Sequence, residues 1–391
     1  MKEVYIVSMA RTPIGSLSGS LSALTAVELG KTAIEAAIER AGISGDQVQE
    51  VIMGNVLTAN VGQAPARQAA LAAGVSNSAT CTTVNKVCAS GMKAIALAAQ
   101  SIMLGDSDIV VAGGMESMSK APFYIPTGRT GIRYGNGEII DAIVRDGLQD
   151  PYKANMMGNT GEICAAKYNF TREKQDEYAV ESYRRAQEAY DKGYFDDELV
   201  PVTISTRRGE VVVDKDEEVG KFRADKVSSV RPAFQKDGTV TAVNASKIND
   251  GAAAVVLMSK EKAEELGIKP LAKVLSYADA EQEPDWFTTT PAKAIPLAVK
   301  KAGKTIEDID LFEINEAFSV VALANIELLK LDPAKVNVLG GAVSMGHPIG
   351  VSGARLVCTM ISALKHKGGK TGAVAICNGG GGATALVIEK M

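Results

Sequence analysis

A repeated pattern constrains the fold of this chain more than any other feature of its sequence. Residues 90–94 (SGMKA) open one helical segment, and residues 352–356 (SGARL) open another. Each helical segment is followed by a short polar turn, an apolar run typical of a buried strand, and a glycine cluster, at 113–114 and at 379–382. Self-similar units of this kind indicate an internal duplication. We therefore expect two similar α/β halves.

Strand-like and helical patterns alternate in the first and last thirds of the chain. The expected strands are residues 4–7, 51–53, 108–112, 311–314, 336–338 and 373–376. The expected helices are residues 26–41, 88–103, 292–302 and 352–365. Such alternation predicts a mainly parallel sheet with helices on its faces.

The middle of the chain, about residues 119–245, has a different character. It contains a loop with glycines and arginines at 127–137, a charged helical segment at 171–192, and a stretch of mixed charge at 214–231. We expect an insertion that covers the first half. It is either a place where a ligand binds or a surface excursion without a function.

The composition and the cysteines narrow the class of protein. A net charge of −4 over 391 residues gives no positive field that would attract nucleic acid. The N-terminus lacks the pattern of a signal peptide, and no uninterrupted apolar run approaches the ~18 residues that span a bilayer. The 5 cysteines are widely spaced, without a Cys-x-x-Cys or His-x-x-x-His pair that would indicate zinc. We expect a cytoplasmic protein with free thiols and no membrane partner.

Three segments carry residues suited to nucleophilic chemistry. Cys88 lies at or near the start of a helix, where unpaired N–H groups and the helix dipole favour a thiolate; a buried structural cysteine is the alternative. His347 lies on a rigid loop, GHPIG. Cys377 precedes Asn378 and four glycines, whose backbone N–H groups can approach an oxyanion. A phosphate loop is less favoured there, because no Gly-Lys-Ser/Thr follows.

Six segments together resemble the thiolase family. They are NKVCASG (85–91), GGMESM (113–118), NAS (244–246), NEAF (315–318), GHPIG (346–350) and CNGGG (377–381), in family order over nearly the whole chain. The resemblance implies the α/β thiolase fold, in which two duplicated halves stack as five layers (α/β/α/β/α). The implied parts are an N-terminal half (1–118 plus about 246–268), a loop domain (119–245) and a C-terminal half (269–391). A homodimer, or a homotetramer built through the loop at 129–137, is also implied.

By resemblance, the expected chemistry is a two-step acyl exchange. His347 takes the proton of Cys88, and the thiolate attacks an acyl thioester to give an acyl-enzyme and free CoA. Cys377 then removes the α-proton of acetyl-CoA, and the carbanion attacks the acyl group to give acetoacetyl-CoA. His347 and a water held by Asn315 would stabilise the enolate oxygen, and the N–H groups of Cys88 and Gly379 the tetrahedral one. No cofactor is required for this chemistry.

The resemblance also implies which positions contact CoA and which hold potassium. The positions matched to CoA contacts are Met157, Lys221, Arg223, Phe234, Ser246, Ala317 and Phe318. The positions matched to the site of members that respond to potassium are Tyr183, Ala242, Val243, Ala245 and Val343. Several of these would offer carbonyl oxygens, which hard cations prefer.

Several functions are compatible with these residues. The leading expectation is an acetyl-CoA C-acetyltransferase. Short-chain members usually have a histidine where this chain has Met156, which leaves open a broad-range 3-ketoacyl-CoA thiolase of fatty-acid degradation. A decarboxylating ketoacyl synthase would need a second catalytic histidine or an asparagine and no Cys377. A non-catalytic acyl-CoA-binding protein is disfavoured, because the reactive positions are all present.

Overall fold

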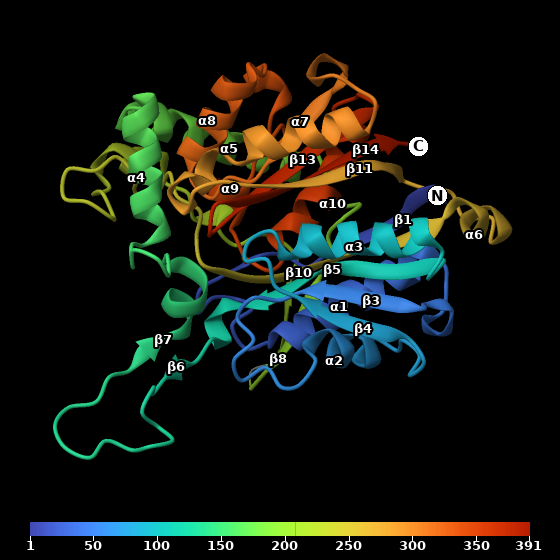
Figure 1. Ribbon diagram of the computed structural model, residues 1–391, viewed down its shortest axis with the longest axis horizontal. Helices are drawn as coiled ribbons and strands as arrows, with labels where there is room; N and C mark the ends of the chain where they lie inside the picture. The colour runs from blue at the N-terminus through green and yellow to red at the C-terminus, as the bar shows by residue number, and fades with distance from the viewer. Residues whose placement is uncertain (208) are drawn as a thin grey trace.

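A ten-stranded mixed sheet runs through the molecule in the computed structural model, which describes residues 1–207 and 209–391 (Figure 1). Its strands are β1 (Val4–Arg11), β2 (Gly15–Ser16), β3 (Glu50–Gly54), β4 (Thr80–Val84), β5 (Ile109–Ser117), β10 (Asn249–Ser259), β11 (Ala272–Glu281), β12 (Leu311–Ile314), β13 (Thr371–Asn378) and β14 (Gly382–Lys390). The order is β12-β13-β14-β11-β1-β10-β5-β3-β4, with β2 paired to β10.

The two ends of this sheet repeat one plan, which confirms the duplication. From the centre outward, β1-β10-β5-β3 corresponds to β11-β14-β13-β12 in both order and direction. The halves meet where Val4, Tyr5 and Ile6 of β1 pair antiparallel with β11.

The prediction of a mainly parallel sheet is wrong. Among the described residues, only β3–β4, β3–β5 and β12–β13 pair in parallel. Strand β14 follows β13 through a tight glycine turn and must run back along it, and β10 runs antiparallel to both of its neighbours, β1 and β5. Strands buried on both faces read as continuous apolar runs, so the sequence does not reveal their direction.

The expected strand at 336–338 is also wrong. Val336 makes only an isolated bridge to Phe312, in the place that β4 takes beside β3 in the other half. The cause is Asn337, whose φ of 50° is incompatible with an extended strand. Its side-chain amide instead bonds to the backbone N–H and C=O of Ile314, at 2.8 and 2.9 Å.

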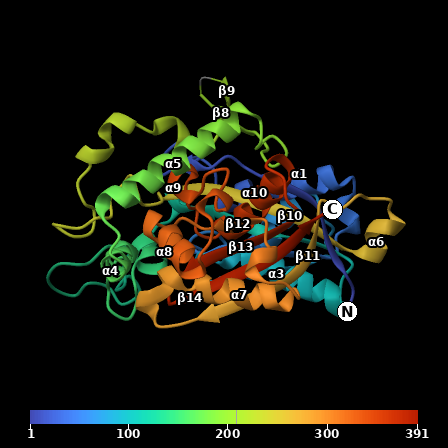
Figure 2. The same ribbon diagram turned by 90° about the horizontal axis from the view of Figure 1, so that it is seen from above.

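Helices cover both faces of each half and give five layers (Figures 1 and 2). The helices are α1 (Ala26–Ala41), α2 (Pro65–Ala72), α3 (Ser90–Leu104), α4 (Met157–Tyr168), α5 (Arg172–Asp191), α6 (Lys260–Glu265), α7 (Pro291–Lys301), α8 (Ser319–Leu329), α9 (Ala342–Met345) and α10 (Ser352–His366). Helices α1 and α2 pack on the outer face of the N-terminal half, α7 packs on that of the C-terminal half, and α3 and α10 fill the space between them.

Helix α3 is the core of the middle layer. By length and composition alone, Val87–Leu104 could cross a membrane. Its apolar run is interrupted by polar residues such as Lys93, so it does not appear as a continuous apolar stretch in the sequence. In the structure, Met92, Ile95 and Ile102 are fully buried in the cluster that joins the two halves. Its apolar character is therefore explained by packing between two sheets.

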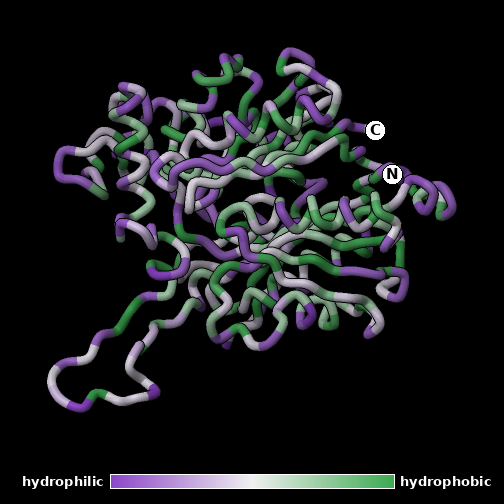
Figure 3. Tube along the Cα trace, in the orientation of Figure 1, coloured by the Kyte–Doolittle hydropathy of each residue, from purple (hydrophilic) through white to green (hydrophobic). Residues whose placement is uncertain are grey.

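Residues 119–248 form a long excursion before β10. They contain the strand pairs β6 (Phe123–Tyr124) with β7 (Ile140–Asp141) and β8 (Val202–Thr206) with β9 (Gly209–Val213), together with α4 and α5. Short helical turns of the chain are Gly45–Gln47, Met118–Lys120, Ile143–Leu148, Val219–Lys221, Ala224–Ser229, Pro284–Thr289, Ile306–Asp308 and Pro333–Lys335. The segment between β6 and β7 projects from the body, and Figure 3 shows short hydrophobic stretches on it.

Candidate active site

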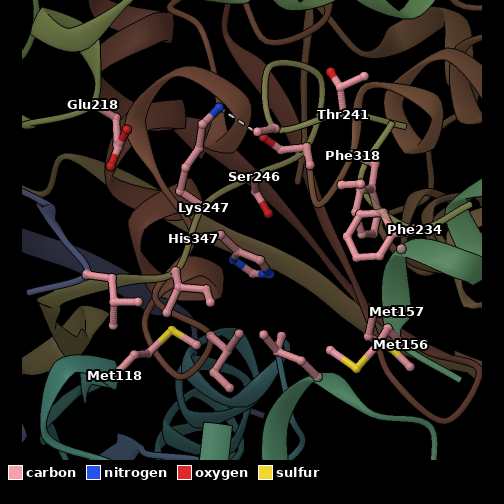
Figure 4. A pocket seen from close by; sticks show the side chains of 18 of the residues that line it. Met118, Met156, Met157, Glu218, Phe234, Thr241, Ser246, Lys247, Phe318 and His347 are labelled. Carbon is pink, nitrogen blue, oxygen red and sulfur yellow. Dashed lines mark hydrogen bonds between the residues drawn. The ribbon is translucent and has the colours of Figure 1, made fainter. Parts of the chain in front are cut away.

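A cavity of about 580 Å³ lies where the excursion meets both halves (Figure 4). Its wall includes Ser16, Leu17, Met118, Leu148, Met156, Met157, Gly158, Glu218, Lys221, Ala233, Phe234, Thr241, Ala242, Ala245, Ser246, Lys247, Ile248, Phe318, His347 and Ile349. Most of this wall is apolar, with a few polar groups, which is the usual character of a small-molecule site.

Cys88 lies on a strained turn beside this cavity, packed against Met118 and Ile349 of its wall. It precedes the first residue of α3 by two positions, as expected. Val87 has a φ of 47°, a conformation that costs energy for a β-branched residue and that clusters at functional sites. The Ser90 hydroxyl holds the turn, accepting from the Lys86 N–H at 2.8 Å and donating to the Val87 carbonyl at 2.6 Å.

The environment of the Cys88 sulfur keeps it protonated in the free protein. Its half-buried side chain packs against an apolar cluster that includes Met118 and Ile349. This burial raises the pKa of the thiol to about 12, although the backbone N–H groups of Gly379 and of Cys88 itself lower it. The expected effect of the N–H groups is present, but it does not give a thiolate in the free protein, because the loss of hydration outweighs it.

His347 is a buried, neutral imidazole that points into the cavity (Figure 4). Its Nδ1 lies 2.6 Å from Ser352 Oγ, and this hydroxyl donates to the Pro348 carbonyl at 2.9 Å. We infer that Nδ1 carries the proton and that Nε2 has the free lone pair. Burial, helped by the positive charge of Arg355, lowers the pKa of His347 to about 3. The imidazole can thus accept a proton only transiently.

Cys377 and Asn315 complete the cluster. Asn315 Nδ2 lies 3.5 Å from His347 Nε2. Cys377 lies near the end of β13, and burial, followed by the charge of Cys88, raises the pKa of its thiol well above the usual value. The turn after it depends on Gly381, where φ is 94° and a Cβ would lie 2.1 Å from the Gln282 carbonyl oxygen. The structure therefore brings Cys88, Cys377 and Gly379 together, and it places Asn315 beside His347. Cys88 packs against Ile349, which lies in the cavity wall with His347.

Most positions expected to contact CoA lie along the cavity. Those in its wall are Met157, Lys221, Phe234, Ser246 and Phe318. Ala317 is buried beside Phe318, and Arg223 is exposed; among the described residues, neither of these two is part of the wall. Lys221 reaches across to Ser16 Oγ at 2.6 Å and pairs with Glu217 at 2.7 Å.

The positions expected to hold potassium do not fit a free ion. The Nζ of Lys247 lies 2.8 Å from the carbonyl oxygen of Val343, 3.0 Å from that of Ala245 and 3.5 Å from that of Val243. It also lies 5.2 Å from the centre of the Tyr183 ring. The carbonyl oxygens that would bind potassium are therefore bonded to an ammonium group, and Ala242 is the remaining expected position, exposed on the cavity wall.

Three other side chains that organise the site do not stand out in the sequence. Ser352 fixes the tautomer of His347, and Asn249 accepts the His347 backbone N–H at 2.9 Å. The buried Glu116 carboxylate accepts backbone N–H groups from Val56, Leu57 and Gly350. It thus ties the loop under Cys88 to the loop that carries His347. Glu116 falls within a family motif, but only the contacts reveal its partners.

Ser352→Ala is expected to lower kcat by about ten-fold or more with little change in KM, because the imidazole loses the partner that fixes its proton on Nδ1. Steady-state kinetics would measure this. The control is Ser362→Ala, which removes another buried serine of α10 that bonds to Glu198 away from the cavity. Equal losses in both variants would indicate a general effect on stability.

Alkylation of Cys88 by iodoacetamide in the free protein is expected to accelerate steadily from about pH 6 to about pH 9, because only the thiolate reacts. Since the thiol's pKa of about 12 lies above this range, each pH unit should increase the rate about ten-fold. Mass spectrometry of the Cys88 peptide gives the rate. A plateau beginning near neutral pH would contradict the prediction and indicate a resting thiolate.

Comparison with known proteins decides the family. The model of the thiolase N-terminal domain matches residues 4–261, and that of the thiolase C-terminal domain matches residues 268–390. The chain belongs to the thiolase family. These matches cover both halves and the excursion, and they confirm the expected fold.

Relatives of this thiolase match it over their full length. It is 57% identical to the cytosolic acetyl-CoA acetyltransferase ERG10 of Gibberella zeae, covering 99% of this chain and 98% of the relative. It is 58% identical to acetyl-CoA acetyltransferase 1 of Arabidopsis thaliana, covering 100% and 95%. The crystal structure of the Acat5 thiolase from Ascaris suum in complex with coenzyme A superposes with a TM-score of 0.95, at 50% identity and 100% coverage of both chains.

Proposed function

We propose that this thiolase is an acetyl-CoA C-acetyltransferase. It joins two molecules of acetyl-CoA into acetoacetyl-CoA and CoA, and it catalyses the thiolytic cleavage in reverse. The observation that carries the proposal is that two interacting thiols lie beside a cavity whose wall holds a neutral imidazole, with backbone N–H groups facing the Cys88 sulfur. The names of its relatives support the same activity.

The first step forms an acetyl-enzyme. Nε2 of His347 takes the Cys88 proton as the sulfur attacks the thioester carbonyl, so no free thiolate has to persist in the buried site. The N–H groups of Cys88 and Gly379, which lie beside the Cys88 sulfur, would hold the oxygen of the tetrahedral intermediate. The intermediate collapses and expels the CoA thiolate, which takes the proton from His347. The low pKa of that imidazole favours this return of the proton.

The second step forms the carbon–carbon bond. Cys377 gives its proton to His347, which is neutral again after the first step. As a thiolate, Cys377 then removes a proton from the methyl group of a second acetyl-CoA, while His347 and a water on Asn315 hold the enolate oxygen. The carbanion attacks acetyl-Cys88 and displaces the Cys88 sulfur, which regains a proton from His347.

The residues of the cavity wall support the proposed substrate contacts. Met157, Phe234 and Phe318 offer apolar surface for the pantetheine arm, with Ser246 and Ala317 on the adjacent backbone. Lys221 in the cavity wall and the exposed Arg223 would supply positive charge for the phosphates of CoA. The neighbouring structure in complex with coenzyme A supports CoA as the ligand. The chemistry assigned to these residues uses no metal.

Chain length gives the decisive test. Thiolysis rates would be compared for acetoacetyl-CoA and for a 3-ketoacyl-CoA of about eight carbons, the kind of substrate that the apolar Met156 in the cavity wall leaves open. We expect acetoacetyl-CoA to have the higher kcat/KM. A strong preference for the longer substrate would favour the broad-range thiolase instead. Failure to acetylate Cys88 would favour a non-catalytic binding protein.

We further propose a cytoplasmic homotetramer, with a homodimer as the alternative. The segment between β6 and β7 exposes apolar side chains on its projecting surface: Phe123, Ile125, Ile132, Tyr134 and Ile139. A patch of this kind is typical of protein–protein contact. Light scattering of the purified protein would give the number of chains. The relative from Gibberella zeae is described as cytosolic, which supports the location.

A further inference from the structure

The ammonium group of Lys247 is a partly buried cation in the wall of the cavity. An ammonium has three N–H donors and no acceptor. Here three carbonyl oxygens lie around it, from Val343, Ala245 and Val243. The face of the Tyr183 ring lies on a further side. Its donors are therefore matched by acceptors and by an aromatic face, as a monovalent cation requires.

Two carboxylates balance the charge at this place. Glu218, in the cavity wall, and the buried Glu316 both act on Lys247 electrostatically. Glu316 also accepts the backbone N–H of Val343 at 3.1 Å. Val343 thus binds a carboxylate through its backbone N–H and the ammonium group through its carbonyl oxygen. This arrangement fixes the start of α9 between two opposite charges.

The cation joins two parts of the proposed site. Residues 241–248, which carry Ala245 and Ser246, form one wall of the cavity. Val343 belongs to α9, which ends at Met345, two residues before His347. A single point charge therefore connects the wall proposed to hold CoA with the loop that carries the proposed base.

We propose that Lys247 is a built-in replacement for a monovalent metal ion, which makes this thiolase independent of potassium. Lys247 is a positioning residue: it does not touch the reacting atoms, and it holds residues 243–245 and α9 in place. A tethered ammonium needs no binding equilibrium, so the site stays filled at every salt concentration. Removing the side chain leaves the carbonyl oxygens around an empty polar space, which a partly dehydrated K⁺ can enter.

The test compares Lys247→Ala with Lys247→Met in potassium, sodium, lithium and choline chloride at equal ionic strength. The alanine variant opens the site to an ion, whereas methionine keeps the bulk of the side chain and removes its charge. The full-length protein is used throughout, and three quantities are measured: the melting temperature, the affinity for CoA by calorimetry, and kcat and KM for acetoacetyl-CoA. Only the last of these rests on the proposed function.

We expect the wild type to give the same values in all four salts. In choline, both variants should bind CoA about ten-fold more weakly or worse, because a buried charged group has lost its contacts or its charge. Potassium should restore CoA affinity and raise the melting temperature of Lys247→Ala, with sodium and lithium less effective, and it should have no effect on Lys247→Met. If Lys247→Ala folds only when potassium is present, the proposal is also supported.

Lys301→Ala is the matched control. Lys301 also donates to a backbone carbonyl, that of Tyr277 at 3.3 Å, and faces its ring at 5.9 Å, but it is exposed on α7 away from the cavity. This variant should respond to no cation. Potassium activation of the wild type, or wild-type CoA affinity in Lys247→Met, would overturn the proposal. Absence of acetyltransferase activity in the wild type would overturn the proposed function and leave the melting and CoA-binding results to decide the role of Lys247.

Discussion

Cys88→Ala is expected to lower kcat for thiolysis of acetoacetyl-CoA by about 10⁴-fold or more, because no other group can carry the acyl chain between the two steps. The variant should fold normally, since Cys88 is half-buried and the change to alanine removes only its sulfur. Steady-state kinetics would measure the loss. Intact-protein mass spectrometry after mixing with acetoacetyl-CoA should find an acetyl group on the wild type and none on the variant.

Cys81→Ala provides the control for that experiment. Cys81 is also partly exposed, but it lies on β4, beside Arg67. Its loss should leave both activity and acetylation unchanged. If Cys88→Ala kept more than about one per cent of the wild-type kcat, covalent catalysis at this residue would be excluded.

Cys377→Ala is expected to separate the two steps. Condensation and thiolysis should fall by about 10²- to 10⁴-fold, the usual contribution of a positioned acid or base. Acetylation of Cys88 by acetyl-CoA should persist, because it needs His347 and not Cys377. The exchange of labelled CoA into acetyl-CoA measures this first step alone, and its ratio to the condensation rate gives the separation.

Cys164→Ala is the control for packing around the second thiol. Cys164 is buried in the same apolar cluster as Cys377. Removal of either sulfur should cost similar stability, on the order of 1 kcal/mol, and only Cys377→Ala should block condensation. A parallel loss of exchange and condensation in Cys377→Ala would contradict the assignment of Cys377 to the second step alone.

The sequence predicts those features of the fold that depend on local pattern. Helix α10 and strand β13 follow directly from periodicity, and the glycines after Cys377 mark a turn. The direction of β10 and β14 does not follow, because a strand covered on both faces looks the same in either direction. Asn337 interrupts the expected strand because its side chain, and not its backbone, bonds to the backbone of Ile314. The spacing of apolar residues in the sequence does not reveal such a replacement.

The functional site likewise has features that the sequence predicts and features that only the structure reveals. The residue types at Cys88, His347 and Cys377 indicate reactive groups, and the structure places the two thiols together beside the cavity wall that holds His347. Their protonation depends on burial, which no local motif contains, so the sequence does not reveal that the Cys88 thiol stays protonated. Lys247 is an ordinary residue in the sequence until its tertiary contacts show an ammonium among carbonyl oxygens.

The position of β10 has a consequence for how the chain folds as it is synthesised. This strand lies between β1 and β5, yet it comes last among the strands of its half, after the long excursion. Until residue 259 has left the ribosome, β1 and β5 have no partner on the sides that β10 will occupy. Both strands are mostly apolar, so the nascent chain carries two unpaired, aggregation-prone strand edges for much of its translation. We expect chaperones to shield this half until the strand arrives.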